Sequence, residues 1–337
     1  MENTPLSLVT GANGHLGNNL VRALLNKGIN VRASVRDLSN NSPFKGLTAQ
    51  LVKADITDKK SMVHALEGVH TFYSVGASFK LWAKNPVKEI YDVNMEGTRL
   101  CIEAAKEAGV KKIIYVSSIA ALDYTRIPTR ESNGYNPDRR NWYYNSKNDG
   151  EQLAFELSAK HGIELVSVMP SAMIGEVALP PLSVSYGILK LVLNKEIPVD
   201  TKITLNWVDV KDVAEGLYQA AQRGRNGERY ILANEQCMGI QEVTAIAKEL
   251  YPELGIKMPA SVPKGILYLI AWLMEIGGKI KGKAPLLSVN DLAMFSGLQQ
   301  NFDISKARTE LGFNPKPPRQ IVVESLQYLM DNKTLFL

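Results

Sequence analysis

The sequence predicts an α/β protein in which a doubly wound parallel sheet carries a smaller, interleaved C-terminal lobe. Short β-branched and apolar runs alternate with longer helical patterns over the first two thirds of the chain, which is typical of βαβ units. A glycine-rich turn joins the first of these runs to a helix, and the alternation stops after Pro170. Because crossovers in such sheets are right-handed, the loops after the strands gather at one edge, where we expect the functional residues.

Six strands are predicted for the sheet, with helices between them. Their ranges are Leu6-Val9, Val31-Val35, Gln50-Lys53, Thr71-Ser74, Ile113-Ser117 and Leu165-Met169. After a break at Pro180-Pro181, helices are predicted over Tyr186-Leu193 and Val213-Ala221. We expect residues 1-170, with a contribution from residues 206-234, to form the large domain. Residues 171-205 and 235-337 are expected to form the smaller lobe, which would hold the substrate.

The composition is that of an ordinary globular protein. Apolar residues make up 45% and charged residues 22% of the 337 positions, so neither disorder nor a fibrous repeat is indicated. The formal net charge of +5 is mild, and no basic run with interleaved aromatic residues occurs, so we expect no nucleic-acid partner. No two of the four histidines have the spacing of paired metal ligands, so no metal site is predicted. The histidines are His15, His64, His70 and His161.

The number of cysteines and the residues that follow Met1 indicate the cellular compartment. Only two cysteines occur, Cys101 and Cys237, which favours a reducing environment. The residues after Met1 lead into the first strand without a basic and apolar leader pattern, so we expect a cytoplasmic protein. The most membrane-like stretch, Gly265-Ile276, is too short to span a bilayer. It is predicted to be a buried or amphipathic helix, with an interfacial anchor as the alternative.

A glycine-rich turn, residues 10-17 (Thr-Gly-Ala-Asn-Gly-His-Leu-Gly), follows the first predicted strand and precedes a helical run. Glycines at this spacing let the chain turn tightly, let backbone N–H groups approach a pyrophosphate and let the helix pack closely. The strand before and the helix after favour a dinucleotide site on a Rossmann-type sheet over a purely structural turn. The candidate cofactor-binding residues are Gly11, Asn13, Gly14, His15, Leu16 and Gly17.

The end of the second predicted strand favours NADP(H) over NAD. NAD sites place a carboxylate there to hold the ribose 2′-hydroxyl, whereas an arginine accommodates the 2′-phosphate of NADP. Arg36 ends this strand; Asp37 competes with it, but its place at the start of a loop gives it a role as a turn former. After the third strand, Asp55 and Ile56 are placed to receive the adenine edge, with a helix cap as the alternative.

Tyr143 and Lys147 lie four positions apart in a long helical pattern, so they share one face. A lysine ammonium at roughly 4 Å, with an effective dielectric near 20, contributes about 4 kcal/mol, or roughly three pKa units, toward the phenolate. The pair is therefore predicted to act as a general acid/base near neutral pH. Ser118, at the end of the fifth predicted strand, is expected to hydrogen-bond the substrate oxygen. Ser117 and Tyr144 are the competing candidates.

These motifs together resemble the extended short-chain dehydrogenase/reductase family over nearly the whole chain. The matching positions are the turn at 10-17, Asp55-Ile56, Asn94, Ser118, Tyr143 with Lys147, and Pro170. The resemblance implies that Asn94 supports the active site and that Lys147 also holds the nicotinamide ribose. It further implies that the backbone after Pro170 contacts the nicotinamide.

Within that family, three segments look most like the dihydroflavonol reductase and cinnamoyl-CoA reductase group, which prefers NADPH. They are residues 35-37, Ser117-Ser118 and residues 302-307. Asp123 departs from the pattern, because plant dihydroflavonol reductases often carry there an asparagine that holds substrate hydroxyls. A flavonoid substrate is therefore not expected. The resemblance also suggests a homodimer.

Together these inferences predict an NADP(H)-dependent oxidoreductase that reduces a carbonyl to an alcohol, or catalyses the reverse, with Tyr143 as general acid/base. The alternatives are an NAD-dependent nucleotide-sugar epimerase or dehydratase and a non-catalytic NADP-binding sensor. We expect an apolar or aromatic small-molecule substrate, because the loops near the site offer no arginine pair for a phosphate clamp. The apolar residues of these loops either line the pocket or pack the lobes together: Phe79, Tyr124, Val177, Leu179, Leu182, Val184 and Tyr186.

Overall fold

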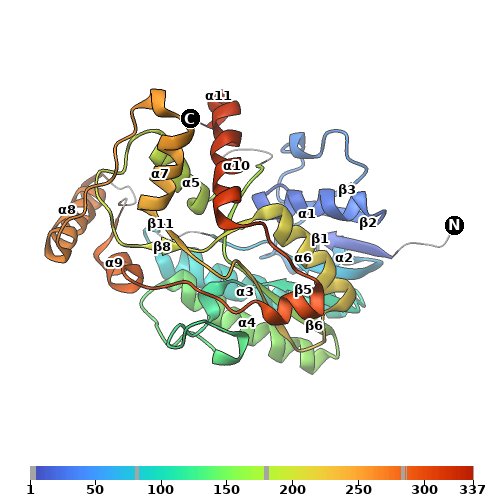
Figure 1. Ribbon diagram of the computed structural model, residues 1–337. Helices are drawn as coiled ribbons and strands as arrows, with labels where there is room; N and C mark the ends of the chain where they lie inside the picture. The colour runs from blue at the N-terminus through green and yellow to red at the C-terminus, as the bar shows by residue number, and fades with distance from the viewer. Residues whose placement is uncertain (1–4, 80–82, 178–181, 282–284, 286, 337) are drawn as a thin grey trace.

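A computed structural model describes residues 5–79, 83–177, 182–281, 285 and 287–336. Its centre is a sheet of seven parallel strands in the order β10-β6-β5-β4-β1-β2-β3 (Figure 1). The strands are β1 (Leu6–Val9), β2 (Asn30–Val35), β3 (Gln50–Lys53), β4 (Val69–Ser74), β5 (Lys112–Val116), β6 (Glu164–Pro170) and β10 (Arg229–Leu232). The predicted fold class and all six predicted strands are confirmed, although β5 ends before Ser117. The sequence analysis missed β10, which supplies the edge strand beside β6.

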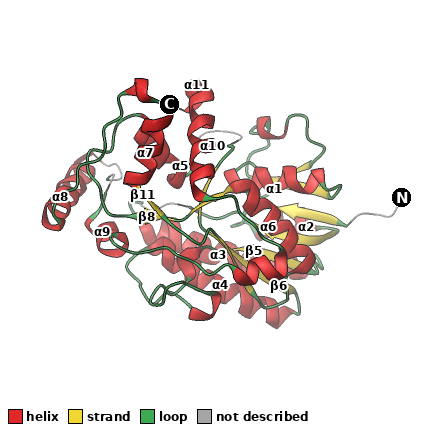
Figure 2. Ribbon diagram, viewed as in Figure 1, coloured by secondary structure: helices red, strands yellow, loops and turns green. Residues whose placement is uncertain are grey.

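Helices cover both faces of this sheet (Figure 2). On one face α1 (His15–Asn26) packs against α6 (Val210–Arg223), with leucines and valines of both helices buried in a common core. On the other face lie α2 (Lys59–Leu66), α3 (Asp92–Glu107) and α4 (Trp142–His161). Both faces of the strands are therefore buried, which explains why they are near-continuous apolar runs in the sequence.

The strand order reverses direction between β1 and β4. From β1 the chain moves outward through β2 to β3, and from β4 it moves the other way through β5 to β6. In open sheets of this kind the crevice at the carboxyl ends of the two central strands is the usual ligand site. The segments that follow β1, β4 and β5 therefore meet where a ligand is expected.

A smaller lobe stands above the carboxyl edge of the sheet, with its own apolar core that includes Trp207 and Tyr186 (Figure 1). Two short two-stranded pairings, β7 with β9 and β8 with β11, belong to this region. Its elements are β7 (Ala172–Ile174), α5 (Val184–Leu193), β8 (Thr204–Leu205), β9 (Trp207–Asp209), β11 (Met238–Gly239), α7 (Ile240–Leu250), α10 (Pro318–Asp331) and α11 (Lys333–Phe336). Between α9 (Val289–Phe295) and α10 the chain returns to the large domain, where Phe302 and Phe313 share the core of α1 and α6.

Two further helices, α8 (Lys264–Lys281) and α9 (Val289–Phe295), form a separate small cluster at the edge of the molecule (Figure 1). Leu267 and Ala271 of α8 are buried against Leu287 and Leu292. A helix is therefore present over residues 265-276, and it is buried on the side of Leu267 and Ala271. In the described part of the chain, no helix is long and apolar enough to cross a membrane.

Candidate active site

The turn after β1 brings glycines to positions where a larger side chain would not fit. Gly11 has a φ of +61°, and a Cβ there would lie 3.1 Å from the Cα of Gly76. A Cβ at Gly17 would overlap the carbonyl oxygen of Gly11. Gly14 donates its N–H to Gly11 over 2.9 Å and is the N-cap residue of α1. The turn therefore presents bare backbone at a helix N-terminus, which suits the pyrophosphate of a dinucleotide.

Thr10 fixes this turn against the loop that follows β4. Its hydroxyl oxygen accepts the backbone N–H groups of Val75 and Gly76, each at 3.0 Å. The hydroxyl also lies 3.3 Å from the carbonyl oxygen of Tyr73, to which it donates. Sequence reasoning did not single out Thr10. Its place between the buried strand and the first glycine was the available signal.

The other predicted residues of the turn differ in exposure. Asn13 is half-buried and Leu16 is buried. Both ring nitrogens of His15 are buried without a hydrogen-bond partner among the described residues. Burial lowers the pKa of His15 to about 4, although nearby backbone and Asp209 act in the opposite direction. The imidazole is therefore neutral at pH 7, and it stacks on Tyr186 of the smaller lobe with 6.1 Å between the ring centroids.

Arg36 is exposed directly after the buried end of β2. Its neighbour Asp37 accepts the backbone N–H of Ser39 at 2.9 Å, and this hydrogen bond lowers the pKa of the Asp37 carboxyl. Asp37 thus has the turn-forming contact that the sequence suggested. Arg36 has the position expected of a side chain that meets the 2′-phosphate of NADP.

Asp55 and Ile56 follow β3 at the same edge. The Asp55 carboxylate accepts the backbone N–H and the hydroxyl of Thr57, at 2.9 and 2.7 Å, and these bonds lower its pKa against the raising effect of burial. The N-cap residue of α2 is Asp58, so the helix-cap alternative for Asp55 is wrong. Ile56 packs against Gly97 of α3 and lines a small cavity that reaches Lys147.

Ser118, Tyr143 and Lys147 come together at the carboxyl end of β5. All three side chains are buried, and the Ser118 side chain lies close enough to Tyr143 to influence its pKa. Ser118 also accepts the backbone N–H of Ala120 at 3.1 Å. Lys147 donates from Nζ to the carbonyl oxygen of Val116 over 3.0 Å. Ser118 and Lys147 thus both lie at the end of β5, with Tyr143 beside Ser118, and the catalytic roles of the three residues stay a prediction.

The competing candidates have other surroundings. The Ser117 hydroxyl is buried and makes no hydrogen bond to any part of the chain that the structure describes. The Tyr144 ring packs against Phe295 of α9, with 5.3 Å between centroids. In the described part of the chain, the side chains of Ser117 and Tyr144 are not hydrogen-bonded to the side chain of Tyr143 or of Lys147.

The pKa of Tyr143 departs from the sequence prediction. Burial raises it well above the usual range, and only the hydrogen bond with Ser118 acts in the opposite direction. The expected lowering by Lys147 is therefore wrong in direction, because the ring is enclosed by apolar groups and by Phe79, whose centroid lies 4.9 Å away. Burial also lowers the pKa of Lys147 to about 8, while Glu151 raises it. At pH 7 the phenol is protonated and the ammonium is charged.

Asn94 supports this arrangement from α3. Its side-chain oxygen accepts the backbone N–H of Ser78 at 2.7 Å, and its amide group donates to the carbonyl oxygen of Ser78 and to Ser146 Oγ, at 3.1 and 2.9 Å. Ser146 in turn donates to the carbonyl oxygen of Tyr143 over 2.8 Å. Asn94 therefore ties the loop after β4 to the first turn of α4.

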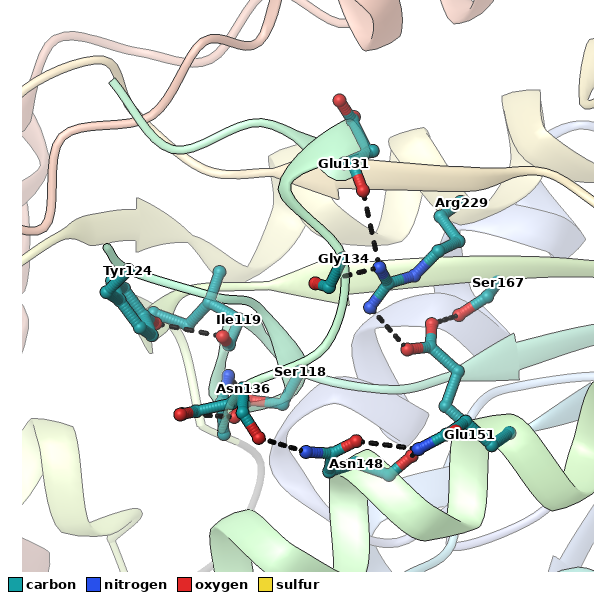
Figure 3. A network of polar contacts seen from close by, with 12 residues as sticks. Ser118, Ile119, Tyr124, Glu131, Gly134, Asn136, Asn148, Glu151, Ser167 and Arg229 are labelled. Atoms are coloured by element: carbon teal, nitrogen blue, oxygen red, sulfur yellow. Dashed lines mark hydrogen bonds and ion pairs between the residues drawn. The ribbon is translucent and has the colours of Figure 1, made fainter. Parts of the chain in front are cut away.

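A second set of hydrogen bonds fixes the loop that follows Ser118 (Figure 3). Asn136 donates from its side chain to the carbonyl oxygen of Ala120 over 3.2 Å, and Asn148 donates to the carbonyl oxygen of Asn136 over 2.6 Å. Tyr124 donates to the carbonyl oxygen of Ile119 over 2.8 Å. The sequence analysis missed both asparagines, because an asparagine outside a cap or turn pattern carries no local signal.

At the other end of Figure 3, Glu151 of α4 and Arg229 of β10 form an ion pair of 2.6 Å. The Glu151 side chain is fully buried and that of Arg229 is 12% exposed. Glu151 also accepts a hydrogen bond from Ser167 of β6. This pair fixes the middle of α4 to the edge of the sheet, one turn beyond Lys147.

The residues predicted for an apolar pocket wall differ in their surroundings. Phe79 is 44% exposed and touches the Tyr143 ring, which fits a pocket wall. Val177 and Tyr186 are buried in the core of the smaller lobe, and the Tyr186 hydroxyl donates to the carbonyl oxygen of Ser325, so a wall role for these two is wrong. Leu182 and Val184 are partly exposed, and Leu179 lies outside the described residues. Asp123 is engaged by Thr125, whose N–H and hydroxyl both donate to it.

Known proteins of similar sequence include some that are named as reductases and one that is named as a sterol demethylase protein. A protein of Synechocystis sp. with the provisional name dihydroflavonol 4-reductase is 31% identical over 332 residues, covering 96% of this chain and 94% of that protein. Sterol demethylase protein B of Methylococcus capsulatus is 28% identical and covers 96% of this chain and 98% of its own. Cinnamoyl-CoA reductase CAD2 of Medicago truncatula is 28% identical over 74% of this chain and 81% of its own.

Solved structures show the same fold over the full chain. The crystal structure of gox2253 is 31% identical, with a TM-score of 0.81 and coverage of 98% of this chain and 99% of the other. Yeast methylglyoxal/isovaleraldehyde reductase Gre2, solved in complex with NADPH, has a TM-score of 0.78 at 18% identity, over 98% of this chain and all of the other (100%).

A family model settles the relationship. The model of the NAD dependent epimerase/dehydratase family matches residues 7–233, which span the glycine turn, the three residues at the end of β5 and the edge strand β10. Relatives named dihydroflavonol 4-reductase and cinnamoyl-CoA reductase place the chain in the group that resembles these reductases. The chain therefore belongs to the NAD-dependent epimerase/dehydratase family of extended short-chain dehydrogenases/reductases, and it is an NAD(P)-dependent oxidoreductase.

Proposed function

We propose that the protein is an NADP(H)-dependent reductase that converts a ketone or aldehyde to an alcohol, with Tyr143 as the general acid. The observation that carries the proposal is the neighbouring pair of buried hydroxyl side chains, Tyr143 and Ser118, at the carboxyl end of β5. Two hydroxyl groups on adjacent elements suit one substrate oxygen, because one of them donates the proton and the other orients the oxygen. The reverse reaction uses the same groups in the opposite order.

The cofactor residues fit NADP(H). The backbone of Gly11, Gly14 and Gly17 would receive the pyrophosphate, since no side chain fits between the turn and α1. Arg36 would hold the 2′-phosphate. The remaining predicted residues would supply further contacts to the cofactor: Asn13, His15, Leu16, Asp55, Ile56, Lys147 and Pro170. When bound, NADPH supplies the hydride that the carbonyl carbon receives.

The protonation states of Tyr143 and Lys147 at pH 7 support reduction. Because burial keeps Tyr143 protonated at pH 7, the phenol is ready to donate to an oxygen that gains negative charge. The charged Lys147 lies on the same face of α4 and would stabilise the phenolate that remains. Ser118 would hydrogen-bond the same substrate oxygen and hold the carbonyl in line. Oxidation at pH 7 would require Tyr143 to lose its proton first, which its raised pKa opposes.

For the substrate we propose an apolar or aromatic carbonyl compound without a diphosphate. Phe79 borders Tyr143 directly, and Phe295 lies beyond Tyr144 on the side of α9. Rings at these places would exclude water and stack on a planar or aliphatic substrate. The names of two relatives, a cinnamoyl-CoA reductase and a sterol demethylase protein, support an apolar skeleton next to the reacting group.

A substrate screen tests this proposal. Purified protein would be offered a matched series of carbonyl compounds, from small polar ketones to aliphatic and aromatic aldehydes and ketosteroids, with NADPH or NADH. Loss of absorbance at the nicotinamide band would measure turnover. We expect kcat/KM to rise with apolar size and to be higher with NADPH. A nucleotide sugar as the best substrate, or activity that does not rise along the series, would contradict the proposal.

A further inference from the structure

One side of α8 exposes a row of large apolar side chains. Of the thirteen large hydrophobic side chains that are exposed in the described residues, six lie on this helix, with exposures between 38% and 80%. They are Ile266, Leu269, Trp272, Leu273, Ile276 and Ile280. Their spacing of three or four positions puts them on one stripe along the helix. A stripe of this length on an ordinary surface helix would be polar.

The opposite side of α8 already has its partner inside the molecule. Leu267 and Ala271 are 2% and 0% exposed and pack with Leu292 of α9. The helix is therefore apolar on the side that holds it to the protein and apolar again on the side that faces away from it. Helices that are apolar all round are covered on all sides, by protein or by lipid. The outer stripe thus needs an apolar partner from outside the chain.

The charges of α8 identify the kind of partner. Between residues 264 and 281 the sequence carries three lysines, Lys264, Lys279 and Lys281, and one acid, Glu275. The Glu275 carboxylate accepts the backbone N–H of Val289 at 2.8 Å, so it is turned toward α9. A second copy of the helix would therefore repeat its excess of positive charge instead of neutralising it. An anionic lipid surface is complementary to this composition.

We propose that α8 docks the protein on the surface of an anionic phospholipid bilayer, lying in the plane of the headgroups with its outer stripe toward the acyl chains. Helices that bind in this way combine an apolar face containing Trp and Leu with lysines near its borders. Trp272 lies at the middle of the stripe, and indole rings favour the headgroup level. The α8 helix stands at the edge of the molecule, away from the N-terminus, where the rest of the chain does not block its approach (Figure 1).

This docking would bring the candidate active site close to the lipid. The α9 helix, which α8 packs against, carries Phe295, whose ring centroid lies 5.3 Å from that of Tyr144 beside Tyr143. The α9 helix therefore lies between the docking helix and the aromatic residues of the site. The lipid-binding inference itself does not depend on the proposed reaction, because it rests on α8 alone.

Vesicle flotation of the full-length protein tests the proposal. Vesicles of phosphatidylcholine alone would be compared with vesicles that mix phosphatidylcholine and phosphatidylglycerol. The variant Leu269→Glu/Leu273→Glu changes two outer residues that are each 55% exposed. The matched control is Ile127→Glu/Leu335→Glu, which changes apolar residues of 53% and 52% exposure elsewhere. Thermal unfolding by circular dichroism would show that both variants are folded.

We expect wild type and the control to float with the anionic vesicles and to bind neutral vesicles more weakly. The α8 variant should lose binding about tenfold or more, because two leucines no longer enter the apolar layer. The tryptophan emission of the protein should shift to shorter wavelength on binding. This shift should be absent in Trp272→Phe. Wild type that stays with the soluble fraction, or binding that the α8 variant retains, would overturn the proposal. A dimer in light scattering that only the α8 variant dissociates would also overturn it, since the stripe would then join two copies.

Discussion

Lys147 donates a hydrogen bond to the backbone carbonyl oxygen of Val116 over 3.0 Å, and this contact holds its ammonium group at the buried end of β5. The pKa of Lys147 is lowered to about 8, chiefly by burial. The lysine is therefore charged below that pH and becomes neutral as the pH rises through it. A group whose charge changes so close to neutrality should make cofactor binding depend on pH.

We expect the affinity for NADPH to be full below pH 8 and to fall above it, as Lys147 loses the charge that would hold the nicotinamide ribose. Fluorescence titration of the cofactor between pH 6.5 and 9.5 would measure the Kd. The matched variant Lys147→Arg keeps a cation throughout this range. Its Kd should be weaker but constant over the same interval, and an equal decline in both proteins would assign the titration to another group.

The choice of cofactor depends on Arg36. Replacing Arg36 with Glu should weaken NADPH binding about 10- to 100-fold, because a charge-assisted contact becomes a repulsion. NADH binding should change little, since it lacks the 2′-phosphate. Lys160→Glu, an exposed site at the end of α4, makes the same change of net charge away from the crevice. Wild type that binds NADH more tightly than NADPH would show that the role given to Arg36 is wrong.

The glycine turn predicts a difference in stability between two alanine variants. Gly17→Ala would force a Cβ against the Gly11 carbonyl oxygen, and we expect a loss of about 1–3 kcal/mol in the free energy of unfolding. Gly187→Ala lies in α5 where nothing is within 4 Å of the new atom, so it should be neutral or slightly stabilising. Urea unfolding would compare the two. Equal stabilities would mean that the turn relaxes around a side chain.

Removal of one partner from the buried ion pair of Glu151 and Arg229 should lower the free energy of unfolding far more than the same removal from an exposed ion pair. Arg229→Met leaves Glu151 buried without its cation, so we expect a loss of about 3–5 kcal/mol in unfolding free energy. Arg319→Met removes the partner of Glu249, and both side chains of that pair are more than half exposed. Its effect should stay below about 1 kcal/mol. Similar losses in the two variants would show that the Glu151 site is more hydrated than its burial indicates.

The fold could be predicted because its sheet is buried on both faces. Parallel strands under two layers of helices must be short apolar runs, and the turn at 10–17 is a local pattern that the backbone requires. β10 escaped prediction because it is a four-residue strand that follows a turn and begins with a charged residue, Arg229. Its place at the edge of the sheet is set by pairing with β6, which no local pattern encodes.

The positions of the candidate site residues could be predicted from the sequence, but the pKa of Tyr143 could not. Ser118, Tyr143 and Lys147 were found because helix periodicity and strand ends place them. The pKa of Tyr143 was not, because its enclosure depends on Phe79 and Ile90, which come from other parts of the chain. For the same reason, Tyr186 was expected at a pocket wall and instead belongs to the core of the smaller lobe.

The central claim is that Tyr143 supplies the proton, and single-turnover reduction by Tyr143→Phe with NADPH tests it most directly. The measurement would use the best aldehyde or ketone of the substrate series, with Tyr144→Phe as the matched control on the adjacent position. We expect Tyr143→Phe to bind NADPH with unchanged Kd and to reduce the substrate about 10²–10⁴-fold more slowly, while Tyr144→Phe stays near wild type. Wild-type rates in Tyr143→Phe together with the loss in Tyr144→Phe would contradict the account and transfer the proton to Tyr144.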